Sequence, residues 1–219
     1  MHLASIQVGT PRSYGAEGAE DSLDRPWTSA IAKQPVSGAI WAGRQGIAGD
    51  MQADREVHGG LDKAVLAYAA AHYAPWRELL GRADVGPGWF GENLTIEGLD
   101  ETTVCVGDRL GIGQAHFEVT QPRQPCATLN RRFHRRDMVK LVQEHHRYGW
   151  YLRVLAEGWV EAGMPVTLLD RPAPQWPVRL ATQVMVERAV RRHECERLAA
   201  CPALSASWRG SLLAAAPAR

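Results

Sequence analysis

Short stretches in which apolar and polar residues alternate dominate the first three quarters of the chain. Alternation with a period of two residues lets a strand bury one face, and we take seven runs as predicted strands: residues 3–8, 36–41, 64–68, 93–96, 109–112, 116–120 and 166–169. Glycine-containing turns separate many of them, and a turn at Gly113 and Gln114 is expected to close a hairpin over residues 109–120. Many short strands divided by such turns favour a mainly β, barrel-like fold.

Apolar residues three and four positions apart predict peripheral helices at residues 71–80 and 137–146. In the first helix, Tyr73, Trp76, Leu79 and Leu80 share one face, and we interpret Tyr73 and Trp76 as core residues. The polar, glycine-rich segment 11–26 is expected to be a loop.

Three prolines mark a change of pattern near the end of the chain. Helical spacing follows at residues 178–190, 191–200 and 205–215, too short a region to bury a core alone. We therefore divide the chain into a β-barrel domain at 1–170, a linker at 171–177 and a three-helix C-terminal domain at 178–219.

Composition narrows the functional classes. The chain has 219 residues, 45% of them hydrophobic, and a net charge of +1, which suits a folded domain and gives no basic excess for a nucleic-acid partner. No apolar run reaches 18 residues and the N-terminus lacks signal-peptide features, so we expect no membrane partner. The four cysteines form no C-x-x-C pair, which indicates reduced thiols and a cytoplasmic location.

Cys126 ends the run Gln-Pro-Arg-Gln-Pro-Cys, residues 121–126. The prolines at 122 and 125 favour a stiff, extended segment outside any helix. If this segment is polyproline II, Arg123 lies on the same side as Cys126, and a nearby cation favours the reactive thiolate. A buried, inert cysteine is the structural alternative.

A second run surrounds two glycines that follow a histidine, His58-Gly59-Gly60. Such a turn exposes backbone amides that can bind an anion, and Arg55, His58 and Lys63 would add charge to it. Read alone, the run fits a tight turn with solvated charges somewhat better than an anion site. Asn93 after Gly91 and Lys33 before Pro35 are weak signals in isolation. The four arginines within residues 131–136 suit a solvated helix face better than a phosphate backbone.

Together these runs resemble the MOSC-domain family, named for the C-terminal domain of molybdenum cofactor sulfurases, and in particular its small YiiM-like branch. The resemblance rests on the runs at residues 29–33, 46–50, 57–63, 90–94, 106–108 and 121–130. The C-terminal region resembles the three-helix appendage of that branch.

The resemblance implies a β-rich, barrel-like fold with a cleft for the molybdenum cofactor, molybdopterin. Cys126 matches the family cysteine taken to ligate molybdenum, a role that suits a soft thiolate. Lys33, Arg55 and His58 match polar positions that line the cleft. Asn93 and Arg123 are further candidates to bind the cofactor.

The enzymatic hypothesis implied by the resemblance is reduction of N-hydroxylated bases and related compounds, a detoxifying reaction. Cys126 would hold the metal, His58 would donate a proton, and Lys33 and Arg55 would bind an anion. A separate reductase must supply electrons, because no flavin or iron–sulfur motif is visible. The alternative is a non-catalytic carrier of the cofactor, or of sulfur as a persulfide on Cys126. A homodimer through the helical tail stays open.

Overall fold

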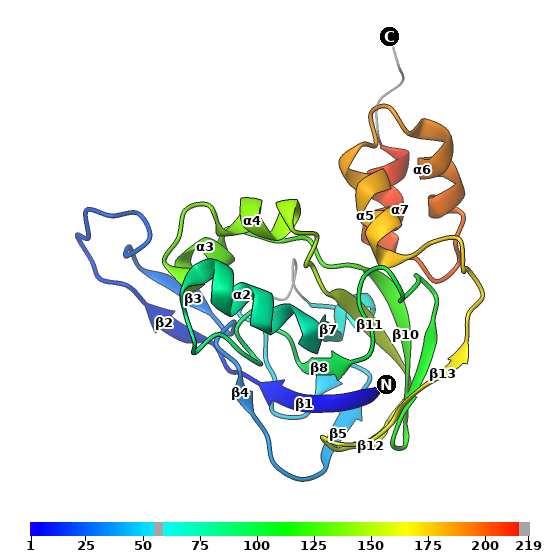
Figure 1. Cartoon of the computed structure of the whole chain (residues 1–219), viewed down its shortest axis with the longest axis horizontal. Helices are drawn as coiled ribbons and strands as arrows, with labels where there is room; N and C mark the ends of the chain where they lie inside the picture. The colour runs from blue at the N-terminus through cyan, green and yellow to red at the C-terminus, as the bar shows by residue number, and fades with distance from the viewer. Residues whose placement is uncertain (55–58, 215–219) are drawn as a thin grey trace.

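The computed structural model describes residues 1–54 and 59–214, and one large sheet organises it (Figure 1). Eight strands form this sheet in the order β13-β9-β10-β11-β7-β8-β1-β4. In chain order they are β1 (His2–Val8), β4 (Gln34–Pro35), β7 (Val65–Ala69), β8 (Leu94–Glu97), β9 (Arg109–Ile112), β10 (Ala115–Pro122), β11 (Trp150–Ala156) and β13 (Val166–Asp170). Only β7 and β8 run parallel within it.

The predicted hairpin is confirmed. β9 and β10 pair with Ile112 opposite Ala115, so the turn lies at Gly113 and Gln114. Gly113 has φ of +55°, and a Cβ there would lie 2.5 Å from the carbonyl oxygen of Trp159. Both features require glycine, which explains why the turn was readable from the sequence.

Other strands differ from the sequence-based expectation. β11 and β12 (Gly158–Val160) were not predicted, and the expected strand at 36–41 is largely wrong, because β5 begins only at Ile40. β5 (Ile40–Gly43) pairs with β12 and with β6 (Gly46–Ile47) in a second, three-stranded sheet. The expected loop at 11–26 contains β2 (Arg12–Tyr14), which pairs with β3 (Trp27–Ser29).

The mainly β, barrel-like prediction is only partly correct. Strand residues outnumber helical ones by 29% to 25%, so the fold is mixed, and the described strands form no closed barrel. β1 approaches the segment before β13 at an isolated bridge, His2 with Pro165, while its last residues pair with β4. This bridge and the hydrogen bonds beside it involve only the first three residues of the chain, so they do not form the continuous ladder that a closed barrel needs.

Helices α2 (Tyr73–Leu80), α3 (Thr128–Phe133) and α4 (Met138–Glu144) lie along one side of the large sheet (Figure 1). Tyr73 and Trp76 are buried with Phe90 and Leu129, which confirms the core interpretation of the aromatic pair. Leu79 is 42% exposed, so that part of the predicted face is wrong. The sequence analysis missed α3, whose six residues give too few turns for a periodic signal.

Three helices, α5 (Val178–Val186), α6 (Arg192–Ala199) and α7 (Ala206–Leu213), form the C-terminal region, and α5 ends earlier than expected. Their apolar cluster also includes Val106, Ala173 and Trp176, so it continues into the preceding segment and the β-rich part. The division at residues 170 and 178 stays a prediction. Within the described residues, none of the helices has the length and apolar character to cross a bilayer.

Candidate functional site

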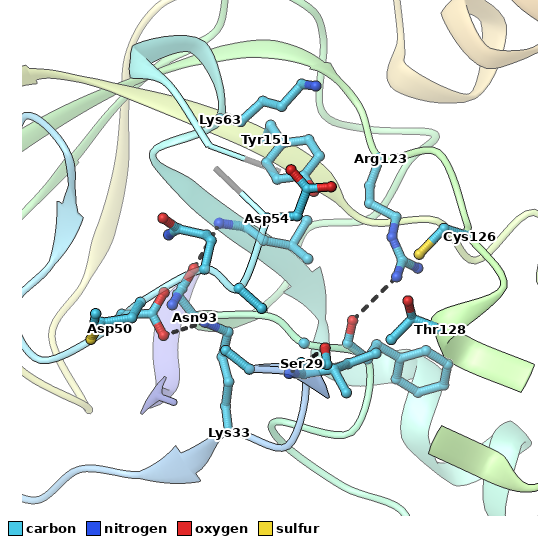
Figure 2. Close-up of a pocket in the computed structure, with 18 of the residues that line it drawn as sticks. Ser29, Lys33, Asp50, Asp54, Lys63, Asn93, Arg123, Cys126, Thr128 and Tyr151 are labelled. Atoms are coloured by element: carbon cyan, nitrogen blue, oxygen red, sulfur yellow. Dashed lines mark hydrogen bonds and ion pairs between the residues drawn. The ribbon is translucent and has the colours of Figure 1, made fainter. Parts of the chain in front are cut away.

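A cleft of about 260 Å³ opens where segments distant in the sequence meet (Figure 2). The lining comes from 28–33, 50–54, 90–93 and 123–128, together with Lys63, Leu66 and Tyr151. Lys33, Asn93, Arg123 and Cys126, four of the predicted site residues, therefore share one cavity. Arg55 and His58 lie outside the described residues, and Gly59 and Gly60 do not line this cleft.

Cys126 lies between the end of β10 and the start of α3, on a segment with no regular secondary structure. This placement confirms the prediction that Cys126 lies outside any helix. The side chain is half-buried, so it is not the sealed, inert cysteine of the structural alternative. Figure 2 shows Cys126 and Arg123 directed into the same cleft.

Arg123 is 5% exposed, so its charge is buried in the wall of the cleft. Its Nη2 donates to the carbonyl oxygen of Phe90 at 3.5 Å, and its buried Nη1 has no hydrogen-bond partner. Among the described residues, no carboxylate forms an ion pair with it. A buried cation without an anion is costly, so Arg123 is a candidate to bind an anion.

Lys33 is also buried, but it has a partner. Its Nζ forms an ion pair with Oδ1 of Asp50, which also accepts the backbone N–H of Gly9 at 2.8 Å. The other oxygen of Asp50 is buried with no hydrogen-bond partner. Burial lowers the pKa of Lys33, and the Asp50 carboxylate opposes that shift. The pair places a cation and an unsatisfied acceptor on the same wall of the cleft.

Asn93 is buried and tied to the sheet. Its side-chain oxygen accepts the backbone N–H of Leu66 at 3.1 Å, and its nitrogen donates to the carbonyl oxygen of Gln7 at 3.3 Å. Both polar groups of the side chain thus join β7, β8 and β1. Asn93 lines the cleft, and its visible contacts shape the wall.

Glu92 lies next to Asn93, in the run at residues 90–94, and the sequence analysis gave it no role. Its buried carboxylate accepts the hydroxyl of Tyr73 at 2.5 Å and the backbone N–H groups of Gly88 at 2.5 Å and Phe90 at 2.9 Å. Burial raises the pKa of Glu92, while these hydrogen bonds lower it. Glu92 therefore orders the 88–91 turn that forms one side of the cleft.

Asp50 and Tyr151 are among the lining residues that the sequence analysis missed. Asp50 is the last residue of the run at 46–50 that supports the family resemblance. Its ion pair with Lys33 places it in the cleft wall. Tyr151 lies on β11, where burial raises its pKa, Arg123 lowers it and Cys126 raises it. The alternation of buried Trp150, Leu152 and Val154 was the available signal for this strand.

The arginines of 131–136 are engaged by the fold itself. Arg132 lies 4.2 Å from the ring centre of Trp89, and Arg136 forms an ion pair with Asp21. Arg135 pairs with Asp137 at 2.8 Å. These contacts account for the cluster without a phosphate backbone.

Comparison with known proteins settles the family. The sequence matches the family model described as the MOSC domain over residues 54–167 and the YiiM-like 3-alpha helix domain over residues 176–214. The chain belongs to the MOSC-domain family. The MOSC match includes Lys63, Arg123 and Cys126, whereas Lys33 and Asp50 precede it.

Relatives extend the match over nearly the whole chain. The protein YflK of Bacillus subtilis is 38% identical over 211 residues, 96% of this chain and 92% of YflK. A protein named "Reductase" from Gibberella moniliformis is 37% identical over 78% of this chain, which spans only 31% of that protein. The crystal structure of YiiM from Geobacillus stearothermophilus has a TM-score of 0.80 at 33% identity, covering 97% of each chain.

Proposed function

We propose that this MOSC protein is a molybdenum-cofactor-dependent oxidoreductase that reduces N-hydroxylated bases and related compounds. The observation that carries the proposal is the presence in one cleft of a half-buried thiol and a buried guanidinium whose Nη1 has no hydrogen-bond partner. Family membership supports the cofactor, and the relative named "Reductase" supports the reaction class.

The residues of the cleft suit a pterin-bound metal that carries an anionic group. Cys126 offers a soft sulfur ligand, the donor type that redox metals of this kind accept. The Arg123 guanidinium offers an N–H without an acceptor, and arginine is well suited to bind phosphate. Lys33 adds a second cation whose proton on Nζ is held by Asp50.

When bound, the cofactor would supply the two-electron chemistry that converts an N–OH group, with two protons, into N–H and water. The chain's own residues would ligate, orient and neutralise charge. Cys126 would hold the metal, Arg123 would anchor the anionic group, and the turn ordered by Glu92 would shape the wall next to Arg123. His58 stays a proposed proton donor. The two electrons would come from a separate reductase.

The decisive experiment is turnover of cofactor-loaded protein. Reduced methyl viologen supplies electrons, N-hydroxyadenine is the substrate, and formation of adenine is followed by chromatography. We expect turnover by the wild type and loss of turnover in Cys126→Ser. Equal activity of the variant would remove Cys126 from the mechanism.

A carrier function is the second candidate, because the half-buried position of Cys126 would also allow transfer of a bound group. Turnover separates the two candidates. A carrier would bind the cofactor stoichiometrically and show no catalytic cycles with any N-hydroxylated compound tested.

A further inference from the structure

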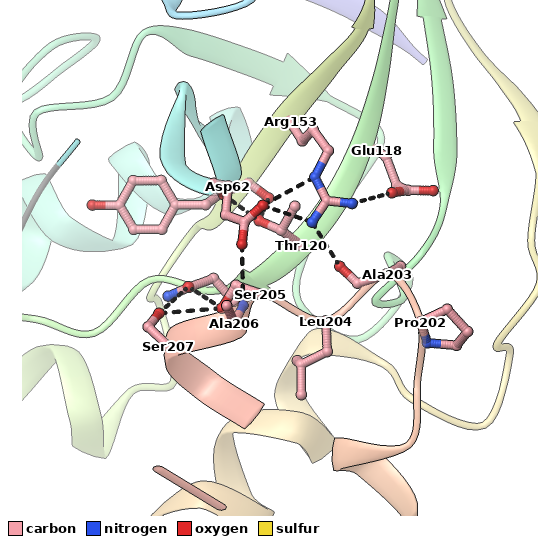
Figure 3. A network of polar contacts seen from close by, with 12 residues as sticks. Asp62, Glu118, Thr120, Arg153, Pro202, Ala203, Leu204, Ser205, Ala206 and Ser207 are labelled. Carbon is pink, nitrogen blue, oxygen red and sulfur yellow. Dashed lines mark hydrogen bonds and ion pairs between the residues drawn. The ribbon is translucent and has the colours of Figure 1, made fainter. Parts of the chain in front are cut away.

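The carboxylate of Asp62 connects the cleft loop to the C-terminal helices (Figure 3). Its Oδ1 accepts from Nη2 of Arg153 at 2.7 Å and from Nε at 3.1 Å. Its Oδ2 accepts the backbone N–H of Ala206, the first residue of α7, at 3.1 Å. Asp62 therefore contacts both β11 and the C-terminal unit, and the next residue, Lys63, lines the cleft.

The partners of Asp62 are themselves fixed. Arg153 donates from Nη1 to Oε2 of Glu118 at 2.9 Å, and Glu118 is only 8% exposed. The hydroxyl of Thr120 donates to the backbone oxygen of Asp62 at 2.6 Å. Fully exposed ion pairs contribute little to stability. The side chains of Asp62 and Arg153 are only 31% and 27% exposed and are joined by two charge-assisted hydrogen bonds, so this pair is expected to hold Asp62 in place.

The start of α7 is anchored to β10, the strand that also carries Glu118 and Thr120. The backbone N–H of Ser205 donates to the backbone oxygen of Thr120 at 3.1 Å, and the Ser205 hydroxyl donates to Oε1 of Gln121 at 2.6 Å. The same hydroxyl caps α7 by accepting the backbone N–H of Trp208 at 3.2 Å. Ser205 and Gln121 are buried, so α7 reaches Asp62 from a rigid base.

We propose that the C-terminal three-helix unit completes the cleft by fixing the loop of residues 59–63 through Asp62, which makes Asp62 a positioning residue for Lys63. The loop needs such a support, because Gly60 has φ of +94° and a Cβ there would meet no atom within 4 Å. Two successive glycines lose much conformational freedom on ordering. Among the described residues, no atom lies where it could pack against a side chain at position 60. The functional meaning of this support rests on the proposed cofactor site.

Two substitutions test the connection from its two sides. Asp62→Asn removes the charge that Arg153 binds, and Ala206→Pro removes only the N–H that reaches Asp62. Proline is tolerated at the first position of a helix, and Ser205 already has the extended backbone that suits a residue before proline. Glu194→Gln is the control, because it breaks the Arg191–Glu194 pair within the C-terminal unit away from the loop.

The first measurement is hydrogen–deuterium exchange of the cofactor-free protein, with the amide of Lys63 as reporter, since it donates to Gly60 at 3.0 Å. We expect exchange of residues 59–63 to become about fivefold faster in Asp62→Asn, the factor that about 1 kcal/mol gives, and about threefold faster in Ala206→Pro. Glu194→Gln should leave the loop unchanged. Unchanged loop exchange in both test variants, or equal changes in all three, would overturn the proposal.

The second measurement is the pterin retained per protein after gel filtration, with the unfolding midpoint recorded alongside. Both test variants should retain several-fold less pterin than Glu194→Gln at a similar midpoint. Faster exchange of residues 59–63 with unchanged pterin retention would show that the contact of Asp62 with the C-terminal unit does not affect the cleft, and it would overturn the proposal. Absence of pterin from the wild type would instead contradict the proposed function, and the exchange result would still stand.

Discussion

Arg123 provides an unusual prediction, in which removal of a site residue stabilises the protein. The substitution is Arg123→Met, which keeps an unbranched side chain of similar length and removes the charge. Arg123 is 5% exposed, Nη1 has no hydrogen-bond partner, and the bond of Nη2 to Phe90 is long at 3.5 Å. The desolvation cost of the cation is therefore opposed by little within the described residues.

The magnitude follows from these contacts. Desolvation of a buried ion costs several kcal/mol, and replacement of buried charges by well-packed apolar groups often stabilises by about 1–4 kcal/mol. The bond to Phe90 at 3.5 Å opposes only a small part of that gain. For the cofactor-free protein we expect the free energy of unfolding to rise by about 1–3 kcal/mol, and each kcal/mol to raise the melting temperature by about 2–4 °C.

The assay is urea unfolding of both proteins, produced in cells that do not make the cofactor, followed by tryptophan fluorescence. Arg153→Met is the matched control. Arg153 pairs with Asp62 at 2.7 Å and with Glu118 at 2.9 Å, so its removal leaves two carboxylates without their cation and should destabilise. The same chemical change is thus expected to have opposite signs at the two arginines.

A loss of stability in Arg123→Met as large as that in Arg153→Met would refute the reasoning, because it would show that the Arg123 charge is compensated. Function should change in the other direction. The variant produced with the cofactor should retain less of it, since the stabilised protein has lost the proposed anion-binding group. A stability gain with unchanged retention would keep the electrostatic account and remove Arg123 from the proposed site.

Two further predictions concern buried acids of the cleft. Lys33→Met should lower the free energy of unfolding, measured in urea, by about 3–5 kcal/mol, because it leaves the carboxylate of Asp50 buried without a cation. Adding Asp50→Asn should recover part of this loss. Equal losses in the single and double variants would contradict this account. Burial raises the folded-state pKa of Glu92, so the stability it contributes is fully present below the ordinary pKa of 4.5 and is lost as the pH rises through the folded value. Urea unfolding at pH 4.5 to 7 should therefore show a smaller fall of stability in Glu92→Gln than in the wild type, and parallel curves would exclude Glu92 as the cause.

The sequence predicted those parts of the fold in which a local pattern determines the structure. The β9–β10 hairpin was found because Gly113 marks its turn and the alternation on both sides is regular. The three C-terminal helices were found because proline-rich segments separate them from the β-rich part. β11 was missed although Trp150, Leu152 and Val154 alternate with more exposed residues, so its signal was present.

The open sheet could not be predicted from alternation. Closure depends on whether β1 pairs continuously with the segment before β13. Among the described residues, the contact is confined to the first residues of the chain, with the bridge of His2 to Pro165 and backbone hydrogen bonds of Met1 and Leu3 to residues 163–166. Continuous pairing depends on the twist of the sheet and on β4, which pairs with Gln7 and Val8 at the end of β1. Both are properties of the assembled sheet.

Four residues of the cleft could be predicted from the sequence, but their contacts could not. The prolines around Cys126 indicated an extended segment, and the cleft contains both Cys126 and Arg123. The ion pair of Lys33 with Asp50 and the lack of a partner for Arg123 Nη1 depend on segments far apart in the chain. Asn93 was predicted to bind the cofactor, and the structure shows its amide engaged with Leu66 and Gln7.

The most direct test is X-ray absorption at the molybdenum edge of the cofactor-loaded protein. The account predicts one more sulfur neighbour of molybdenum in the wild type than in Cys126→Ser, with similar pterin content in the two samples. Identical sulfur coordination in the two proteins would contradict the claim that the Cys126 thiolate is the metal ligand.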